Sequence, residues 1–318
     1  MKGVMDWLTE EDQPTVRYLA MRDLLDASES DLRESRAAIP ARGWVKQILE
    51  KRLPGGYWVH PEDLYRPKYF STNWMLLALS DLGVTRELPW VAESAEMWRD
   101  TFARADGGFD TPGAESSELC TVGNTARALV RFGYEDDPKV RSAFAWLVRN
   151  QKPNGGWDCF GRNGVIDGWE GVSAFAAYPR QKWTRGMREA VDRGLEFYLE
   201  RRLLREGRYD PWHRLHFPYH YYYDALVGLE FVTALGRGGD PRVEPALRLL
   251  KRKRLKDGRW QMDAIHPDVL NSGRLPKYYL KRKKELKPFS LEPAGKPSKM
   301  ITLRALRVLE RAGESIPA

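Results

Sequence analysis

The chain has 318 residues, of which 42% are hydrophobic and 30% charged, with two cysteines and a formal net charge of +8. Two cysteines in a chain of this length argue against a disulfide-bonded extracellular scaffold, and no apolar run approaches the roughly 18 to 20 residues of a membrane span. Since the sequence does not begin with the charged and apolar regions of a signal peptide, we expect a soluble cytoplasmic protein.

Helices that are apolar over most of their circumference recur along the chain. The first covers residues 15–25, and five more are predicted at 74–84, 120–132, 169–178, 223–235 and 301–309. A helix of this kind is surrounded by protein, so we predict six inner helices.

More polar helices lie between the inner ones and are expected outside them. Asp137-Pro138 and Asp240-Pro241 each open such a helix with a capping carboxylate and a proline in the first turn. The charged segments 183–204 and 243–256 belong to the same group. We predict about five to six outer helices of this type.

A glycine-containing turn followed by an aromatic residue comes directly after an amphipathic helix five times. The aromatic residues are separated by 52, 48, 52 and 51 positions, so the chain is a tandem array of repeats. The five copies are Gly55-Gly56-Tyr57, Gly107-Gly108-Phe109, Gly155-Gly156-Trp157, Gly207-Arg208-Tyr209 and Gly258-Arg259-Trp260.

Two layers of helices predict an all-α protein, a closed double ring or α/α toroid. An open stack of repeats needs polar end caps, whereas the last inner helix, 301–309, is apolar enough to need the N-terminal helices as its partner. Residues 1–318 then form a single domain, with 261–297 as an irregular basic insertion. The alternative is an open helical-repeat scaffold, because residues 14–19 look like the start of such a repeat.

Positive charge is concentrated in residues 251–256 and 277–287. Runs of this sort are usually solvated surface, but they also suit a phosphate-rich partner such as a diphosphate or a lipid headgroup, which would give peripheral membrane contact through 277–287. Nucleic acid ranks lower, because no nucleic-acid-binding motif accompanies the basic residues.

The turn from Gln151 to Trp157, with its other copies, resembles the QW-type repeats of the superfamily of squalene-hopene cyclases and protein prenyltransferase β-subunits. The resemblance covers the chain from about Thr15 to Leu309. It implies an α/α toroid whose central cavity is lined with aromatic residues and holds an isoprenoid chain. We therefore expect an elongated apolar ligand.

The aromatic content is compatible with this ligand, since 12 Trp, 14 Tyr and 11 Phe exceed what the turns require. Aromatic faces stabilise a developing carbocation by about 0.5 to 2 kcal/mol per ring. The alternative is that these rings fill the core. The residues expected to bind substrate lie on or just before inner helices and are Trp74, Trp169, Tyr219, Tyr221, Tyr222 and Tyr223.

Two catalytic residue sets are implied by the resemblance, and both are incomplete. The D-x-D-D-T-A motif of the cyclases corresponds to residues 121–126, where Gly123 takes the place of the proton-donating aspartate, so standard acid-initiated cyclisation is not expected. For the zinc site of the prenyltransferases, Asp167 and His220 match two ligands and Trp169 replaces the cysteine. Cys159 could supply the missing thiolate for Zn²⁺, or could be a small buried hydrophobe.

Several carboxylates at the starts of inner helices are candidates for acid–base chemistry. Asp224 is the first choice as general acid or base, with helix capping as its alternative. Glu170 forms a carboxylate pair with Asp167, and Glu118 precedes Cys120 at another helix start. His213 and His216 are expected at the surface.

These features predict an isoprenoid- or terpenoid-processing enzyme of the cyclase or prenyltransferase type that lacks the standard acid. Its catalytic residues are expected among Asp224, Asp167, His220 and Glu170, and its metal ligands are Asp167, Cys159 and His220. The alternative is a non-catalytic lipid-binding or interaction protein with the same fold.

Overall fold

The computed structural model describes residues 2–204, 210–265 and 290–314. Over these ranges the regular elements are helices joined by loops with isolated β-bridges, which confirms the all-α prediction. The chain forms two compact units, one made of residues 1–35 and 202–318 and the other of residues 36–201. The basic segment 277–287 and the turn copy at 207–209 lie outside the described residues.

The unit of residues 36–201 has two layers. Its inner helices are α5 (Thr72–Ser80), α7 (Leu119–Phe132) and α9 (Glu170–Ala177), and most of their residues are buried. α7 packs against both α5 and α9. The outer helices bury one face each and are α6 (Pro89–Phe102), α8 (Pro138–Arg149) and α10 (Arg185–Glu200). The shorter α4 (Gly43–Leu49) and the 3-10 helices Ile39–Ala41 and Arg180–Lys182 complete it.

The other unit joins the two ends of the chain. Its helices are α1 (Lys2–Leu8), α2 (Pro14–Leu24), α11 (Ala225–Ala234), α12 (Glu244–Arg252) and α15 (Lys299–Arg311), with 3-10 turns at Asp210–His213 and Pro241–Val243. The boundary between the units falls within α3 (Glu29–Ala37).

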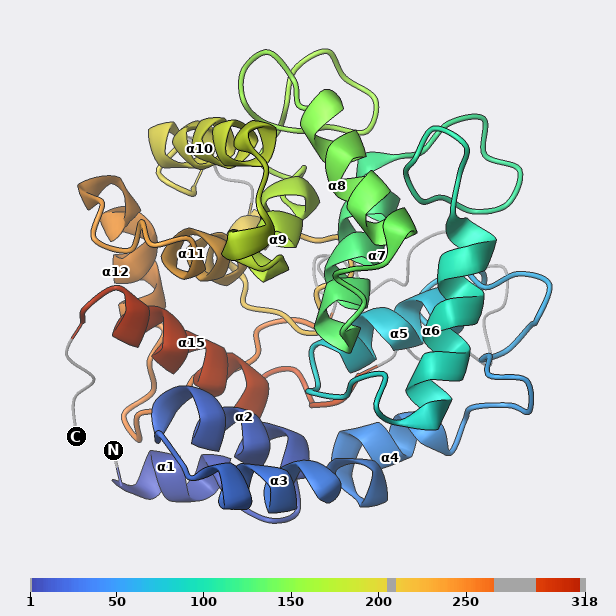
Figure 1. Ribbon diagram of the computed structural model, residues 1–318. Coiled ribbons are helices and arrows are strands. Elements are labelled where there is room, and N and C mark those ends of the chain that lie inside the picture. Colours follow the sequence, from blue (N-terminus) through green and yellow to red (C-terminus); the bar gives the residue numbers. More distant parts are fainter. Residues whose placement is uncertain (1, 205–209, 266–289, 315–318) are drawn as a thin grey trace. The chain divides into compact units, whose positions relative to one another are not determined.

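The last inner helix contacts the N-terminal helices, as its apolar sequence predicts. α15 packs on α1, α2 and α11, and Figure 1 shows the red α15 beside the blue α2. Lys299 Nζ lies 2.7 Å from Glu10 and 3.1 Å from Asp12, and Arg307 pairs with Asp23 at 3.3 Å. The two ends of the chain are thus held together by apolar packing and ion pairs.

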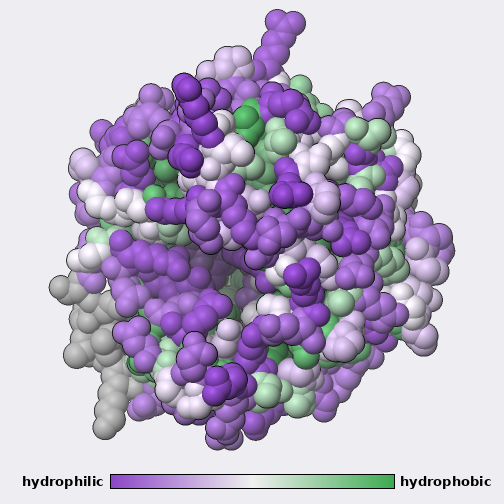
Figure 2. All heavy atoms as spheres, in the orientation of Figure 1, coloured by the Kyte–Doolittle hydropathy of each residue, from purple (hydrophilic) through white to green (hydrophobic). Residues whose placement is uncertain are grey.

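All six predicted inner helices are present, with shifted ends. α2 differs from the others, because it buries only Pro14, Thr15, Val16, Leu19 and Ala20 and leaves its other face more open. Within the described residues, no helix has the length and apolar character needed to cross a membrane. Figure 2 shows a face on which hydrophilic residues predominate and hydrophobic ones form small patches.

The glycine turn recurs with the same geometry in the four described copies. Gly56, Gly107, Gly155 and Gly258 all have φ between 84° and 90°, a left-handed conformation that favours glycine. In each copy the amide of this glycine donates to the carbonyl three residues earlier, at Leu53, Arg104, Lys152 and Leu255. The outer helix is therefore followed by the same reversal of the chain each time.

A buried tryptophan ties three of these turns to the preceding helix. The indole Nε1 of Trp58, Trp157 and Trp260 donates to the carbonyl ten residues earlier, on Ile48, Leu147 and Leu250, at 2.8 to 2.9 Å. The prediction for the first copy was wrong by one residue, because Trp58 is buried there and Tyr57 is only half-buried. The tryptophan that bonds to the helix is thus the residue two positions after the left-handed glycine.

The turn glycine at position 155 should tolerate no side chain. In Gly155→Ala the new Cβ would lie 2.6 Å from the Arg193 carbonyl oxygen, a backbone atom of α10, and the left-handed conformation adds strain. We expect Gly155→Ala to lose at least about 1 kcal/mol more unfolding free energy than a control, because overpacking costs about 1 to 3 kcal/mol. Urea unfolding followed by circular dichroism measures it.

The matched control is Gly113→Ala. Gly113 also has a left-handed φ, of 86°, but no atom lies within 4 Å of a Cβ built there. The control therefore carries the conformational cost of about 1 to 2 kcal/mol without the clash. Equal losses in the two variants would show that the contact with α10 does not restrict position 155.

Candidate functional site

Asp224 begins the inner helix α11 and is fully buried. Its carboxylate accepts a hydrogen bond from the Val227 amide at 2.9 Å, so it caps the helix. The same carboxylate accepts from the backbone amide of His216 at 3.0 Å and lies 2.6 Å from His216 Nδ1. Asp224 is therefore a cap that also holds a histidine side chain.

His216 is fully buried, so the expectation that it lies at the surface was wrong. The loop that carries it is paired with a second segment: Leu215 N donates to the Asp263 carboxylate, and Asp263 N donates to the Leu215 carbonyl, at 2.9 and 2.8 Å. This pairing brings the apolar stretch Leu215-His216-Phe217 into the core. His213, in contrast, is half-buried.

The two ring nitrogens of His216 differ, because Nδ1 contacts a carboxylate and Nε2 does not. An ionised carboxylate can only accept, so the short contact with Asp224 assigns the ring proton to Nδ1 and leaves a lone pair on Nε2. Among the described residues, the buried Nε2 has no hydrogen-bond partner. A buried polar atom of this kind needs a partner such as a ligand or a water molecule.

Tyrosines surround the imidazole on the same loop. The ring centroid of Tyr219 lies 5.7 Å from that of His216, and the ring of Tyr222 lies 6.3 Å away, both edge-on. Tyr219 and Tyr223 are buried, whereas Tyr221 and Tyr222 are half-buried and stack on each other with centroids 4.7 Å apart. His220 is buried and has a left-handed φ of 49°.

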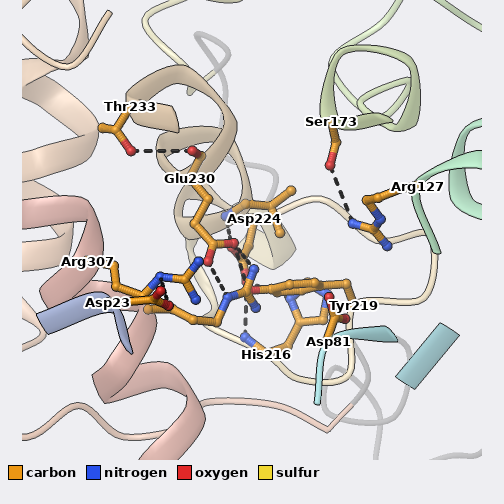
Figure 3. A network of polar contacts seen from close by, with 12 residues as sticks. Asp23, Asp81, Arg127, Ser173, His216, Tyr219, Asp224, Glu230, Thr233 and Arg307 are labelled. Carbon is orange, nitrogen blue, oxygen red and sulfur yellow. Dashed lines mark hydrogen bonds and ion pairs between the residues drawn. The ribbon is translucent and has the colours of Figure 1, made fainter. Parts of the chain in front are cut away.

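An ion pair lies next to Tyr219 (Figure 3). The Tyr219 hydroxyl donates to Glu230 on α11 at 3.1 Å, and Arg304 on α15 makes a two-pronged contact with the same carboxylate. The Arg304 guanidinium also lies 3.2 Å from the centre of the Tyr219 ring. The ion pair connects two inner helices and fixes the orientation of the tyrosine.

A second cluster of reactive side chains lies at the start of α7. Glu118 caps this helix through its backbone, Cys120 is in the first turn, and Cys159 comes from the loop before α9. Their potential ligand atoms all lie within 4.8 Å of one another. The pKa of the Cys120 thiol is raised by its hydrogen bond with Cys159 and by burial, and the pKa of Cys159 is lowered by the hydrogen bond with Cys120.

Glu170 is buried at the start of α9. Burial, followed by the nearby Cys159, raises its pKa well above the usual range, so the carboxyl group favours its neutral form. Gly123 on α7 faces this residue, and a Cβ on Gly123 would lie 2.6 Å from the Glu170 Cβ. The glycine at the position expected for a cyclase acid is thus required by the close approach of α7 and α9.

The other predicted substrate and metal residues are placed as follows. Trp169 is buried with the Arg127 guanidinium 4.8 Å from its ring, and Trp74 is buried with its indole donating to the Tyr65 carbonyl at 2.8 Å. Asp167 is exposed and lies outside the cluster of Glu118, Cys120 and Cys159. His220 belongs to the unit of residues 1–35 and 202–318, whereas Asp167 and Cys159 belong to the unit of residues 36–201. The set of Asp167, Cys159 and His220 as metal ligands stays a prediction.

Comparison with known proteins shows similarity at the level of structure. No protein-family model matches the sequence, and no curated protein matches it. The chain is similar to a solved protein from Actinoplanes, with a TM-score of 0.46 and 16% identity over 95% of this chain and 90% of that one. It is also similar to the type II terpene cyclase MstE from Scytonema, with a TM-score of 0.47 and 15% identity over 97% and 88%.

A further solved form of MstE contains its substrate, geranylgeranyl dihydroxybenzoate, and matches with a TM-score of 0.36 and 15% identity over 98% of this chain and 99% of that one. At 15 to 16% identity, these similarities are similarities of fold and say nothing about activity.

Removal of the Glu230 carboxylate should destabilise the protein, because Arg304 would keep its charge in a buried position. The Arg304 side chain is 6% exposed and that of Glu230 is 20% exposed. Breaking such a pair by removing one partner costs about 3 kcal/mol, so Glu230→Gln should lower the urea midpoint clearly.

Glu189→Gln is the matched control, since Glu189 pairs with Arg185 at a surface where the two side chains are 53% and 93% exposed. Exposed pairs contribute little, so this variant should keep the wild-type midpoint. The same midpoint in both variants would contradict the structural role of the Glu230–Arg304 pair.

Proposed function

We propose that the protein is an enzyme that holds a long apolar, isoprenoid-type substrate inside a closed ring of helices and transfers a proton with His216 and Asp224. The proposal rests on one observation: the fully buried His216–Asp224 pair, whose Nε2 has no hydrogen-bond partner among the described residues. Burial of a polar atom without a partner costs free energy, and a substrate group that pairs with Nε2 would offset this cost.

The arrangement has the features of a general base. Asp224 is held by the amides of Val227 and His216, so it cannot turn away from the imidazole. A carboxylate at Nδ1 fixes the tautomer and stabilises the imidazolium that forms when Nε2 takes a proton. The tyrosine rings of the same loop provide aromatic walls that suit a cationic or apolar reacting group.

Protonation of an alkene is not supported at the other candidate acid. Gly123 carries no acid, and the raised pKa of Glu170 makes its carboxyl group a weaker proton donor than an ordinary glutamic acid. Proton removal by His216 is therefore the more suitable reaction class, and it requires a substrate that forms its own carbocation by losing a leaving group such as diphosphate, after which Nε2 takes a proton and an alkene forms. Asp224 supports this step and does not act as the strong acid of a standard cyclase.

The isoprenoid class of the substrate rests on the resemblance of the repeats and on the apolar inner helices. Within its unit, α15 packs on α1 and α2, so the last helix of the array lies against the first ones. An α/α toroid would leave a central space for an extended chain.

Turnover assays test the proposal. We expect the purified protein to convert geranylgeranyl diphosphate, whose diphosphate is the leaving group, to a product seen by mass spectrometry, and His216→Gln to lower the rate at least about 100-fold, which is the usual contribution of a positioned base. His213→Gln is the matched control. His213 is a half-buried histidine outside the His216–Asp224 pair, so this variant should keep the wild-type rate.

Two outcomes would overturn the proposal. Wild-type protein that retains an isoprenoid in native mass spectrometry without converting it would be a carrier. Equal rates in His216→Gln and His213→Gln would show that the buried pair has a structural role only.

A further inference from the structure

Three side chains of types that can bind metal ions meet in the unit of residues 36–201, away from any role that the proposed function requires. In the parts of the chain that the structure describes, Glu118, Cys120 and Cys159 are the one group of three or more His, Cys, Asp or Glu side chains whose ligand atoms lie within 4.8 Å of one another. They come from two segments, the start of α7 and the loop between α8 and α9. All three are partly accessible.

The first segment is held in place by hydrogen bonds that leave the ligand atoms of the cluster free of these contacts. Asp110 accepts from the Glu118 amide at 2.8 Å, and Asp106 accepts from the Ser117 amide and hydroxyl at 3.0 and 2.8 Å. Cys120 follows in the first turn of α7. The backbone that carries Glu118 and Cys120 is therefore held in place before any ligand binds.

The second segment is a loop closed at its base. The Val165 amide donates to the Trp157 carbonyl at 3.0 Å. The Gly164 amide donates to Asn154 Oδ1 at 2.9 Å, and Asn154 Nδ2 donates to the Gly164 carbonyl at 3.0 Å. Trp157 itself is anchored to α8 through Leu147. Cys159 thus lies two residues after a fixed point, which limits the distance over which its thiol can move.

The charges around the cluster favour a cation. Asp158 lies near Cys159 and Asp110 lies near Glu118, and Lys68 is the basic group near Glu118. Two thiolates and a carboxylate in this setting would repel one another, and a divalent cation would remove that repulsion.

We propose that Glu118, Cys120 and Cys159 bind a zinc ion. Zinc accepts thiolate sulfur at about 2.3 Å and carboxylate oxygen at about 2.0 to 2.2 Å in a tetrahedral shell. Side-chain atoms within 4.8 Å of one another need only small movements to reach these distances from a common centre. Magnesium and calcium prefer all-oxygen shells, so the two sulfur ligands select zinc or another soft ion.

Three protein ligands leave one of four positions open. Binding displaces the two thiol protons into solvent, and the open position takes a water molecule or a sulfur or oxygen atom of a substrate. Sites with three protein ligands and an open position are the ones in which zinc acts on bound water or substrate. The site would therefore be reactive as well as stabilising.

The experiment measures metal in the full-length protein, purified without a polyhistidine tag and under reducing conditions. We expect about one zinc per chain by plasma mass spectrometry. After replacement by cobalt(II), a thiolate-to-cobalt charge-transfer band and intense visible bands of a tetrahedral site should appear. Cys120→Ser and Cys159→Ser should each lose most of the bound metal and weaken the charge-transfer band.

Glu118→Gln should reduce zinc affinity at least about 10-fold, while Glu115→Gln, an exposed glutamate three residues earlier, should bind zinc as the wild type does. Far-ultraviolet circular dichroism of each variant distinguishes loss of the site from loss of the fold. His216→Gln should keep its zinc, so failure of the proposed base and failure of the metal site can be told apart.

Two results would overturn the zinc site. One is zinc content in the wild type no higher than in a Cys120→Ser/Cys159→Ser double variant. The other is a Cys120–Cys159 disulfide in protein kept under reducing conditions, detected by mass spectrometry of unreduced peptides.

Discussion

The hydrogen bond from a buried indole to the end of an outer helix is the interaction on which the rest of the structure depends. Trp58, Trp157 and Trp260 each donate to a carbonyl in the last turn of the helix before them. The last carbonyls of a helix have no partner within it, and a buried indole needs an acceptor. One bond satisfies both needs and ends the helix at the left-handed glycine turn.

The same tryptophans connect the turn to the inner layer. Trp58 N donates to the Thr72 hydroxyl on α5, and Trp260 N donates to the Thr302 hydroxyl on α15, at 3.0 and 2.9 Å. The first and last repeats thus have a fixed point between the outer and the inner helix. The loops before the inner helices vary in length. His216 lies in the loop before α11 and Cys159 in the loop before α9, whereas Asp224 caps α11 and Cys120 lies in the first turn of α7.

The two sites have different chemistry and stand independently. The His216–Asp224 pair is fully buried and suits proton transfer, whereas the cluster of Glu118, Cys120 and Cys159 is partly accessible and suits a soft metal ion. Each uses the start of an inner helix, since Asp224 caps α11 and Cys120 lies in the first turn of α7. Glu170 lies between α7 and α9 at a third such start and favours its neutral form.

The sequence by itself determined the all-α class, the repeats and the six inner helices, because apolar periodicity and the glycine-aromatic turns are local signals that packing does not reverse. It also identified Asp224, Glu170 and Cys159 as residues of interest. Only the tertiary structure decided their partners. His216 is buried because its loop pairs with Asp263, and Cys120 meets Cys159 because α7 lies against α9, and both contacts join residues far apart in the chain. Such contacts depend on how loops of variable length fold back, which a single sequence does not encode in any local pattern.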